Sequence, residues 1–330
     1  MRPMFERVMT ALQLTRLSVA FGAVSDLWFM IVLAWMLEGT SMDGVVTGWG
    51  VGSPMTWLPA ALVAGLVVAL GLFGYGASLN DVLDMRHDAT FSPLRPIPAG
   101  RIRPSQAAII TVCSLLVAVL GATVLGTWPV WLTMGVAVLL LFYNTAGRYL
   151  PAVGIVTIGL IHAVHMLIPN PGLAILLPVW LTMTHGMILA LGIYILDDKR
   201  PRMTAQALLG IGAGWVFWSG MLLWLALERG VGLWPEALSP WRLCFPAAAA
   251  LICVLVVRGK CRRAPTPRAA AEKLKRYGAM WQCLYASAWF LALGMLVPGI
   301  GFAVLAVIGF VVMTILREVI GLSGRRVEFR

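Results

Sequence analysis

The feature that most limits the fold of this chain is a series of ten apolar stretches, each close to the length of a membrane-spanning helix. A helix needs about 20 apolar residues to cross a bilayer. The chain is 60% hydrophobic and only 12% charged, whereas roughly a quarter of the residues of a soluble domain are charged. We therefore predict an all-α polytopic membrane protein, with spans at 17–38, 57–83, 106–126, 129–146, 151–168, 174–196, 205–227, 242–257, 280–297 and 300–316.

The basic residues fall almost entirely on one side of these spans. If the loops are assigned alternately to two sides, only Arg229 and Arg242 lie opposite the N-terminus, which leaves 23 of the 25 Lys and Arg on its side. The positive-inside rule makes that side cytoplasmic. The net charge of +11 is therefore a topology signal and a contact for anionic membrane lipids, and we expect no nucleic-acid partner.

No composition boundary divides the chain, and we expect a single domain over 1–330. Pro298-Gly299 is predicted to divide the apolar stretch 280–317 into two helices, because 38 residues exceed one bilayer crossing. The basic segment 258–276 is predicted to be a linker with a short surface helix. The five cysteines show no paired spacing, so we expect neither a disulfide framework nor a zinc site.

An acidic motif, NDVLDMRHD, ends the second apolar stretch. At 100° per residue on a continuous helix, Asn80, Asp81, Asp84 and Asp88 point into one arc of about 100°, spread over about 12 Å. Carboxylates this close repel one another unless a cation lies between them, and Mg²⁺ prefers such oxygen ligands. The motif therefore predicts a magnesium site at the membrane surface. The alternative is a solvated helix end whose acids share no ligand.

A basic loop, LRPIPAGRIRP, follows the motif. Its Arg95, Arg101 and Arg103 carry guanidinium groups that match phosphate oxygens. Carboxylates that hold a metal beside arginines that hold phosphate predict a diphosphate site, whose ligand has a diphosphate head and an apolar tail.

The pattern NDVLDMRHD followed by RPIPAGRI resembles the first aspartate-rich motif of the UbiA superfamily of intramembrane prenyltransferases, NDxxDxxxD and then RPxPxGR. The stretch TRLSVAFGAVSDLWF (15–29) is similar to the family's first helix. FYNTAGRYLP (142–151) is similar to the end of its fourth. The resemblance is strongest over about 10–230, and 280–330 would form a C-terminal helical pair and basic tail.

This resemblance implies a bundle of about nine to ten transmembrane helices around a central cavity that opens to lipid. It implies an enzyme that uses Mg²⁺ to transfer a prenyl group from a polyprenyl diphosphate to an aromatic or other lipophilic acceptor, in a cell inner membrane with the N-terminus cytoplasmic. A second reading is a terpene cyclase, in which the allylic cation is captured intramolecularly. A third is a lipid-binding or transport protein without bond chemistry.

The second aspartate-rich motif of the family departs from its usual DxxxD spacing in this chain. The matching stretch reads GIYILDDKRPRMT, where Tyr194 stands at the position of the first Asp and Asp197 and Asp198 are adjacent. Adjacent helical residues point 100° apart, so we do not expect the two carboxylates to share a metal ion as spaced acids would, and either Asp198 serves alone or the following loop contributes. Lys199, Arg200 and Arg202 of the following loop would supply positive charge.

Two further groups of polar residues lie inside predicted spans. Asp26 is a candidate base toward an acceptor or cation, or alternatively a hydrogen-bonded bundle residue. His162, His165 and His185 fit a metal site, the lining of an acceptor pocket, or hydrogen bonds between helices.

The expected site residues fall into three sets. The expected metal ligands are Asn80, Asp81, Asp84, Asp88, Asp197 and Asp198. The expected catalytic residues are Asp84, Asp88, Asp198 and Asp26. The resemblance and the basic loop together assign the diphosphate to Asn80, Arg95, Arg101, Tyr143, Asn144, Arg148, Tyr194, Lys199 and Arg200.

Overall fold

The computed structural model of the protein describes residue 14 and residues 20–37, 57–173, 175–230, 234–235 and 238–322. Within these ranges the chain is helical and has no strand. The long helices are α2 (Phe21–Leu37), α3 (Leu58–Leu83), α5 (Pro104–Leu125), α6 (Thr127–Thr145), α7 (Pro151–Leu167), α8 (Leu177–Leu196), α9 (Ala205–Glu228), α10 (Cys244–Arg262), α11 (Pro267–Ala292) and α12 (Leu296–Leu322). The short helices are α4 (Met85–Phe91), η3 (Gly147–Tyr149) and η4 (Pro240–Leu243).

Each predicted apolar stretch corresponds to one of the long helices, so the all-α membrane fold is confirmed. Seven helices in the described residues are long and apolar enough to cross a membrane, and α2 and α7 are apolar but 17 residues long. The apolar part of α11 follows a basic first half. The number of spans, nine or ten, and the single domain over 1–330 stay predictions.

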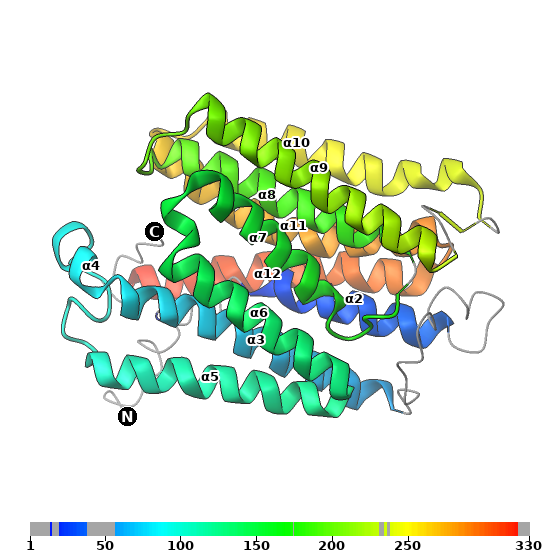
Figure 1. The fold of residues 1–330 in the computed structure, drawn as a ribbon, viewed down its shortest axis with the longest axis horizontal. Helices are drawn as coiled ribbons and strands as arrows, with labels where there is room; N and C mark the ends of the chain where they lie inside the picture. The colour runs from blue at the N-terminus through cyan, green and yellow to red at the C-terminus, as the bar shows by residue number, and fades with distance from the viewer. Residues whose placement is uncertain are drawn as a thin grey trace.

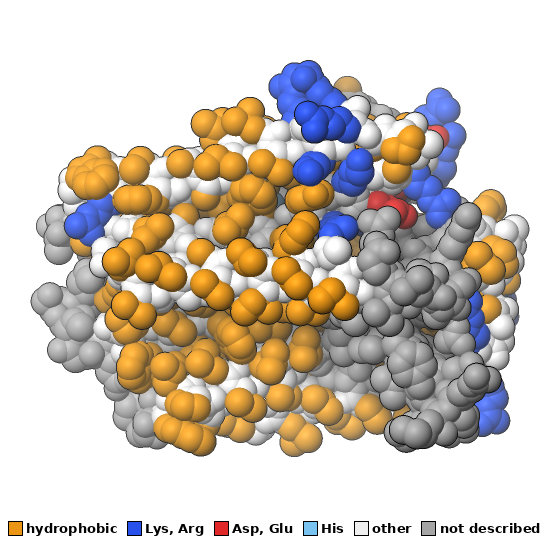
Figure 2. Space-filling model, turned by 180° about the vertical axis from the view of Figure 1, so that it is seen from behind, with side chains coloured by type: hydrophobic (Ala, Val, Ile, Leu, Met, Phe, Trp, Pro, Cys, Tyr) orange, Lys and Arg blue, Asp and Glu red, His pale blue; other side chains and the backbone are white. Residues whose placement is uncertain are grey.

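The long helices lie side by side along the long axis of the molecule (Figure 1). The short helix α4 and the loops that follow α6, α8 and α10 lie at the same end, on the left in Figure 1. Figure 2 shows Lys and Arg side chains gathered mainly at one end, beside a broad face of hydrophobic side chains. We call the end that carries α4 and these loops the basic end.

The outer helices expose apolar faces that only lipid can solvate. In α9, whose 24 residues are strongly apolar, only Ile211 and Ala226 are buried. A soluble protein could not leave such a helix uncovered, because burial of apolar surface drives its folding. The interior is formed around α2 and α11 instead, where Phe29 and Phe290 are fully buried with ring centroids 5.0 Å apart.

Small residues let α3 and α5 approach closely. A Cβ added at Gly71 would lie 2.8 Å from the carbonyl oxygen of Ser114, and one at Gly121 would lie 3.2 Å from that of Ala64. Glycine at such positions permits the close helix contacts that bind membrane bundles together. These contacts lie in the middle and the N-terminal part of α3. Nearer its C-terminal end, before the acidic motif, the hydroxyl of Thr111 in α5 donates to Oγ of Ser78 at 3.0 Å.

Two details of the C-terminal region differ from expectation. The predicted surface helix in 258–276 is the first part of the continuous α11 rather than a separate element. The break before α12 is at Gly294, with φ +81°, and not at Pro298-Gly299. Pro298 lies in the first turn of α12, where a helix does not need its missing N–H group.

Candidate active site

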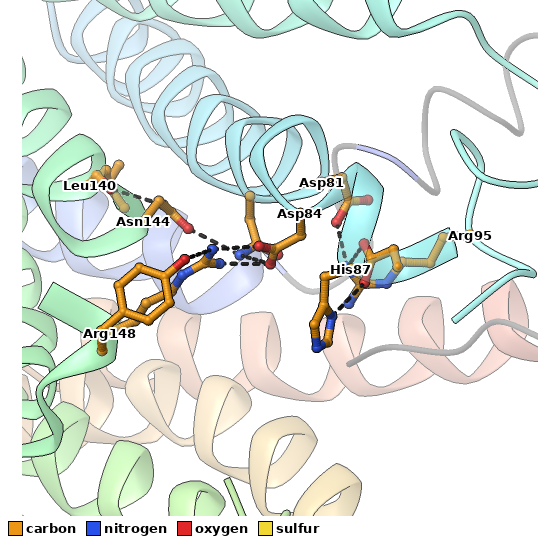
Figure 3. A network of polar contacts seen from close by, with 10 residues as sticks. Asp81, Asp84, His87, Arg95, Leu140, Asn144 and Arg148 are labelled. Carbon is orange, nitrogen blue, oxygen red and sulfur yellow. Dashed lines mark hydrogen bonds and ion pairs between the residues drawn. The ribbon is translucent and has the colours of Figure 1, made fainter. Parts of the chain in front are cut away.

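The acidic motif lies across a helix break and not on one continuous helix. α3 ends at Leu83, Asp84 adopts φ −90° and ψ 3°, and α4 begins at Met85. The expected single arc of four side chains is wrong, because the four divide into two pairs: Asp81 and Asp88, on opposite sides of the break, both contact Arg95, whereas Asn80 and Asp84 face Asn144 and Arg148. Figure 3 shows the result, with Asp81 on the side of Arg95 and Asp84 on the side of Asn144 and Arg148.

One half of the motif holds a buried arginine. Nη1 of Arg95 lies 3.2 Å from Oδ1 of Asp81 and 2.5 Å from Oδ2 of Asp88. All three side chains are buried at the basic end, where a guanidinium between two carboxylates satisfies charges that could not remain unpaired. These two ion pairs hold the loop that carries Arg95 against α3 and α4.

The other half of the motif faces the junction of α6 and η3. Arg148 donates two hydrogen bonds to the carboxylate of Asp84, from Nη1 at 2.7 Å and from Nη2 at 2.5 Å. Nδ2 of Asn80 donates to Oδ2 of Asp84 at 3.2 Å and to Oδ1 of Asn144 at 3.1 Å. The structure therefore brings Asn80 and Asp84 together with Asn144 and Arg148, two residues that the family resemblance placed beside the diphosphate.

Arg148 has donor capacity left for a further acceptor. Its Nη2 also donates to the hydroxyl of Tyr149 at 3.0 Å, and its Nε is buried without a partner among the described residues. Burial lowers the pKa of Arg148, but the hydrogen bonds to Asp84 and Tyr149 and the charge of Asp84 outweigh burial and raise the pKa above the ordinary arginine value. Arg148 thus remains a cation that can bind one more anionic oxygen.

Tyr149 was not singled out in the sequence, where Tyr143 was expected to meet the diphosphate. Tyr143 lies half-buried in the last turns of α6. It lies within electrostatic range of Arg148, Asp84 and Tyr194. Tyr149 also lies against Arg148, with its ring centroid 5.1 Å from the guanidinium carbon. The signal for Tyr149 was its place directly after Arg148 in the stretch that resembles the family.

The loop after α8 holds the residues of the second motif. Asp197 ends α8, with its Oδ2 3.1 Å from Nζ of Lys275 in α11. Asp198 is exposed, has a φ of 45°, and lies 3.7 Å from Nη2 of Arg200. The hydroxyl of Tyr194 donates to the carbonyl oxygen of Pro201 at 2.5 Å, which fastens this loop. Asp197 and Asp198 thus point to different partners.

Two side chains of the first motif carry oxygen atoms that could coordinate a hard divalent cation. Among the described residues, no three His, Cys, Asp or Glu side chains converge. Mg²⁺ commonly uses only one or two protein carboxylates together with substrate phosphates, however. Asn80 and Asp84 supply amide and carboxylate oxygens of the right kind, and the unpartnered Nε of Arg148 marks where a phosphate oxygen would complete the group. The exposed Arg101, which donates to the carbonyl of Leu94, lies on the loop beyond.

The polar residues inside the spans lie among α2, α7, α8 and α11. Asp26 is buried and accepts a hydrogen bond from Gln282, which also contacts His162. His185 lies between the backbone of Gly278 and Tyr285, and His165 is buried. The contacts of His185 are hydrogen bonds between helices, one of the three roles expected for these histidines from the sequence.

Comparison with known proteins identifies a family and several related enzymes. The model of the UbiA prenyltransferase family matches residues 44–277. A polyprenyl transferase, ausN, of Penicillium brasilianum is 42% identical over 66 residues, 18% of this chain and 21% of its own length. A digeranylgeranylglyceryl phosphate synthase of Sulfurisphaera tokodaii is 28% identical over 116 residues, 35% of this chain and 41% of its own. The matched parts thus span less than half the length of these relatives.

A solved structure reported for digeranylgeranylglyceryl phosphate synthase in membranes has the same fold. It is 17% identical to this chain, covers 88% of it and 99% of its own chain, and superposes with a TM-score of 0.55.

Proposed function

Because the chain belongs to the UbiA prenyltransferase family, we propose that it transfers a prenyl group from a polyprenyl diphosphate to a lipophilic acceptor within the membrane. The observation that carries this proposal is the cluster of Asn80, Asp84, Asn144 and Arg148 at the end of an apolar bundle. Such a cluster suits a ligand whose charged head lies at the membrane surface while its apolar tail lies in the bundle.

In this proposal Arg148 receives the diphosphate. Its Nε donates to a phosphate oxygen while its two Nη groups keep their bonds to Asp84. Asn80 and Asn144 hold Asp84 in place through the amide hydrogen bonds that join α3 to α6. A preorganised cation of this kind stabilises the charge that develops as the diphosphate leaves.

Mg²⁺ would be held by Asn80 and Asp84, and it would supply charge neutralisation to the leaving diphosphate. Asp81 and Asp88 serve chiefly to hold Arg95, and through it the corner between α3 and α4. Asp198 and the basic loop Lys199–Arg202 are proposed to approach the diphosphate from the other side of the basic end. Asp26 is proposed to act on the acceptor side.

The protein is an integral membrane protein, and we propose that it lies in the cell inner membrane. The basic end would face the cytoplasm, because Lys and Arg concentrate on the cytoplasmic side of membrane proteins. The N-terminus itself lies outside the described residues. The exposed basic side chains at the end of α10, including Arg262 and Arg263, would meet anionic lipid head groups.

The test is direct assay of the purified full-length protein. It is incubated with Mg²⁺, prenyl diphosphates of graded length and an extract of native membrane lipids, and products are identified by mass spectrometry. We expect a prenylated acceptor and inorganic diphosphate, and loss of both with Asp84→Asn. Arg86→Ala is the matched control, since Arg86 is exposed on α4 beside the motif. A cyclic terpene formed from the diphosphate alone would establish the cyclase reading, and an intact diphosphate would contradict prenyl transfer.

A further inference from the structure

A chain of three polar side chains crosses the interior of the bundle, away from the diphosphate cluster. Nε2 of Gln282 in α11 lies 3.1 Å from Oδ2 of Asp26 in α2 and 3.1 Å from Nδ1 of His162 in α7. His162 is about 16 Å along α7 from Pro151, at 1.5 Å per residue, so it lies deep in the bundle. Polar groups at this depth are costly and usually functional.

The chemistry of the three groups fixes the hydrogen positions. The amide nitrogen of Gln282 faces Asp26 and donates to its Oδ2. The second hydrogen of the same nitrogen then points to Nδ1 of His162, which must accept it. A neutral His162 ring therefore carries its own hydrogen on Nε2.

Glycines on α2 and α8 make room for this arrangement. A Cβ at Gly22 would lie 1.8 Å from Oε1 of Gln282, and a Cβ at Gly186 would lie 2.5 Å from Cδ2 of His162. Any larger residue at either position would move the amide or the ring. The backbone of α2 thus packs closely against the amide of Gln282, and the backbone of α8 packs closely against the ring of His162.

His162 presents a donor that His185 does not. Nε2 of His185 donates to the carbonyl oxygen of Gly278 at 3.1 Å, and its Nδ1 accepts from the hydroxyl of Tyr285 at 3.1 Å. For Nε2 of His162, the described residues provide no hydrogen-bond partner, and the ring is only half-buried. Because the protein does not fully cover the ring, this Nε2–H group is open to an acceptor that a ligand supplies.

Asp26 forms no ion pair with any residue that the structure describes, and neither does His162. An anionic ligand group at this depth would therefore lie without an ion-pair partner from Asp26, Gln282 or His162. An uncharged oxygen carries no such penalty.

Resting on the proposed function, we infer that Asp26, Gln282 and His162 form the binding site for the acceptor, in which Nε2–H of His162 donates a hydrogen bond to an uncharged oxygen of a phenol, alcohol or carbonyl group. His162 is the residue that touches the ligand. Asp26 and Gln282 are positioning residues, since they act through the orientation and tautomer of His162. The site discriminates against acceptors that carry a carboxylate or phosphate.

Binding of a simple phenol tests the site without requiring turnover. The probe is 4-methylphenol, compared with 4-hydroxybenzoate, which has a carboxylate in place of the methyl group. We expect 4-methylphenol to raise the Tm of the detergent-purified full-length protein, 4-hydroxybenzoate to have no effect, and His162→Phe to abolish the shift. His162→Gln, which keeps an acceptor and a donor, should restore part of it. Tyr285→Phe is the matched control, because it removes a bond to His185 and leaves His162 untouched.

Turnover provides the second arm, with geranylgeranyl diphosphate and Mg²⁺ present. We expect His162→Phe and Gly186→Ala to raise the KM for 4-methylphenol by about tenfold, as loss of one hydrogen bond predicts, while diphosphate release continues. The inference is wrong if the protein prenylates both phenols equally well. It is also wrong if His162→Phe changes neither the Tm shift by 4-methylphenol nor the KM for it. If no diphosphate is released by the unmodified protein yet the Tm shift still depends on His162, the proposed function fails and the binding site stands.

Discussion

Replacement of Arg95 by methionine is the change that separates the folding role of the acidic motif from its chemical role. Arg95 is only 7% exposed, and Asp81 and Asp88 are each 3% exposed. Methionine fills a similar volume but leaves two buried carboxylates without their cation. Removal of one partner from a buried ion pair costs about 3–5 kcal/mol. We therefore expect Arg95→Met to destabilise the protein by about this amount, a fall in Tm of roughly 10 °C.

The assay is thermal unfolding of the purified protein in detergent, followed by a double-mutant cycle with Asp88→Asn. Each single change should be strongly destabilising. The double change should cost less than the sum of the two by about 1–3 kcal/mol, because the two side chains form one interaction. Arg148→Met serves as the comparison, since Arg148 and Asp84 are each 19% exposed and water can solvate the carboxylate that remains.

The expected result is a clear division between the two arginines. Arg95→Met should lower stability more than Arg148→Met, whereas Arg148→Met should abolish diphosphate release at temperatures where the variant is folded. If Arg95→Met instead leaves Tm unchanged and removes only diphosphate binding, Arg95 is a ligand of the diphosphate, as its loop sequence suggested, and the structural role argued from its burial is wrong.

Three further predictions concern the metal, the second motif and the topology. Activity should require a divalent ion and fall by orders of magnitude with Asp84→Ala. Full activity in excess chelator would contradict the proposed metal site. Asp198→Ala should reduce activity strongly and Asp197→Ala mildly, as measured by diphosphate release. Asp198→Gly should match Asp198→Ala in activity but be the more stable of the two in thermal unfolding, because glycine adopts the positive φ of this position without strain. Tags at Met1 and Arg330 should both be protected from external protease in intact cells, and cleavage of the C-terminal tag from outside would show an odd number of spans.

The helices could be predicted from the sequence because the membrane allows few alternatives. Backbone polar groups must be satisfied within each segment in lipid, so an apolar stretch of sufficient length must be a helix. The break at Asp84 could not be predicted in this way. The motif NDVLDMRHD contains neither Gly nor Pro, and α4 is held against α3 by Arg95, which lies beyond both helices.

Side-chain contacts between residues far apart in the sequence were the other part of the site that could not be predicted. Asp26 and Gln282 are 256 residues apart, and Asp197 and Lys275 are 78 apart. A single sequence shows which residues are polar inside a span but not which helix faces them. The C-terminal break illustrates the same limit at short range, since Pro298 was the stronger local signal and Gly294 makes the turn.

The helix break at Asp84 has a consequence for protein design. A designer who copied NDVLDMRHD alone into another helical bundle would transfer three carboxylates without the cation that holds two of them. The smallest portable unit is instead the run from Asn80 to Arg95, because only this length contains its own counter-ion and its own corner. A recipient scaffold would then need to provide an asparagine and an arginine at a neighbouring helix end, placed as Asn144 and Arg148 are, to face Asn80 and Asp84.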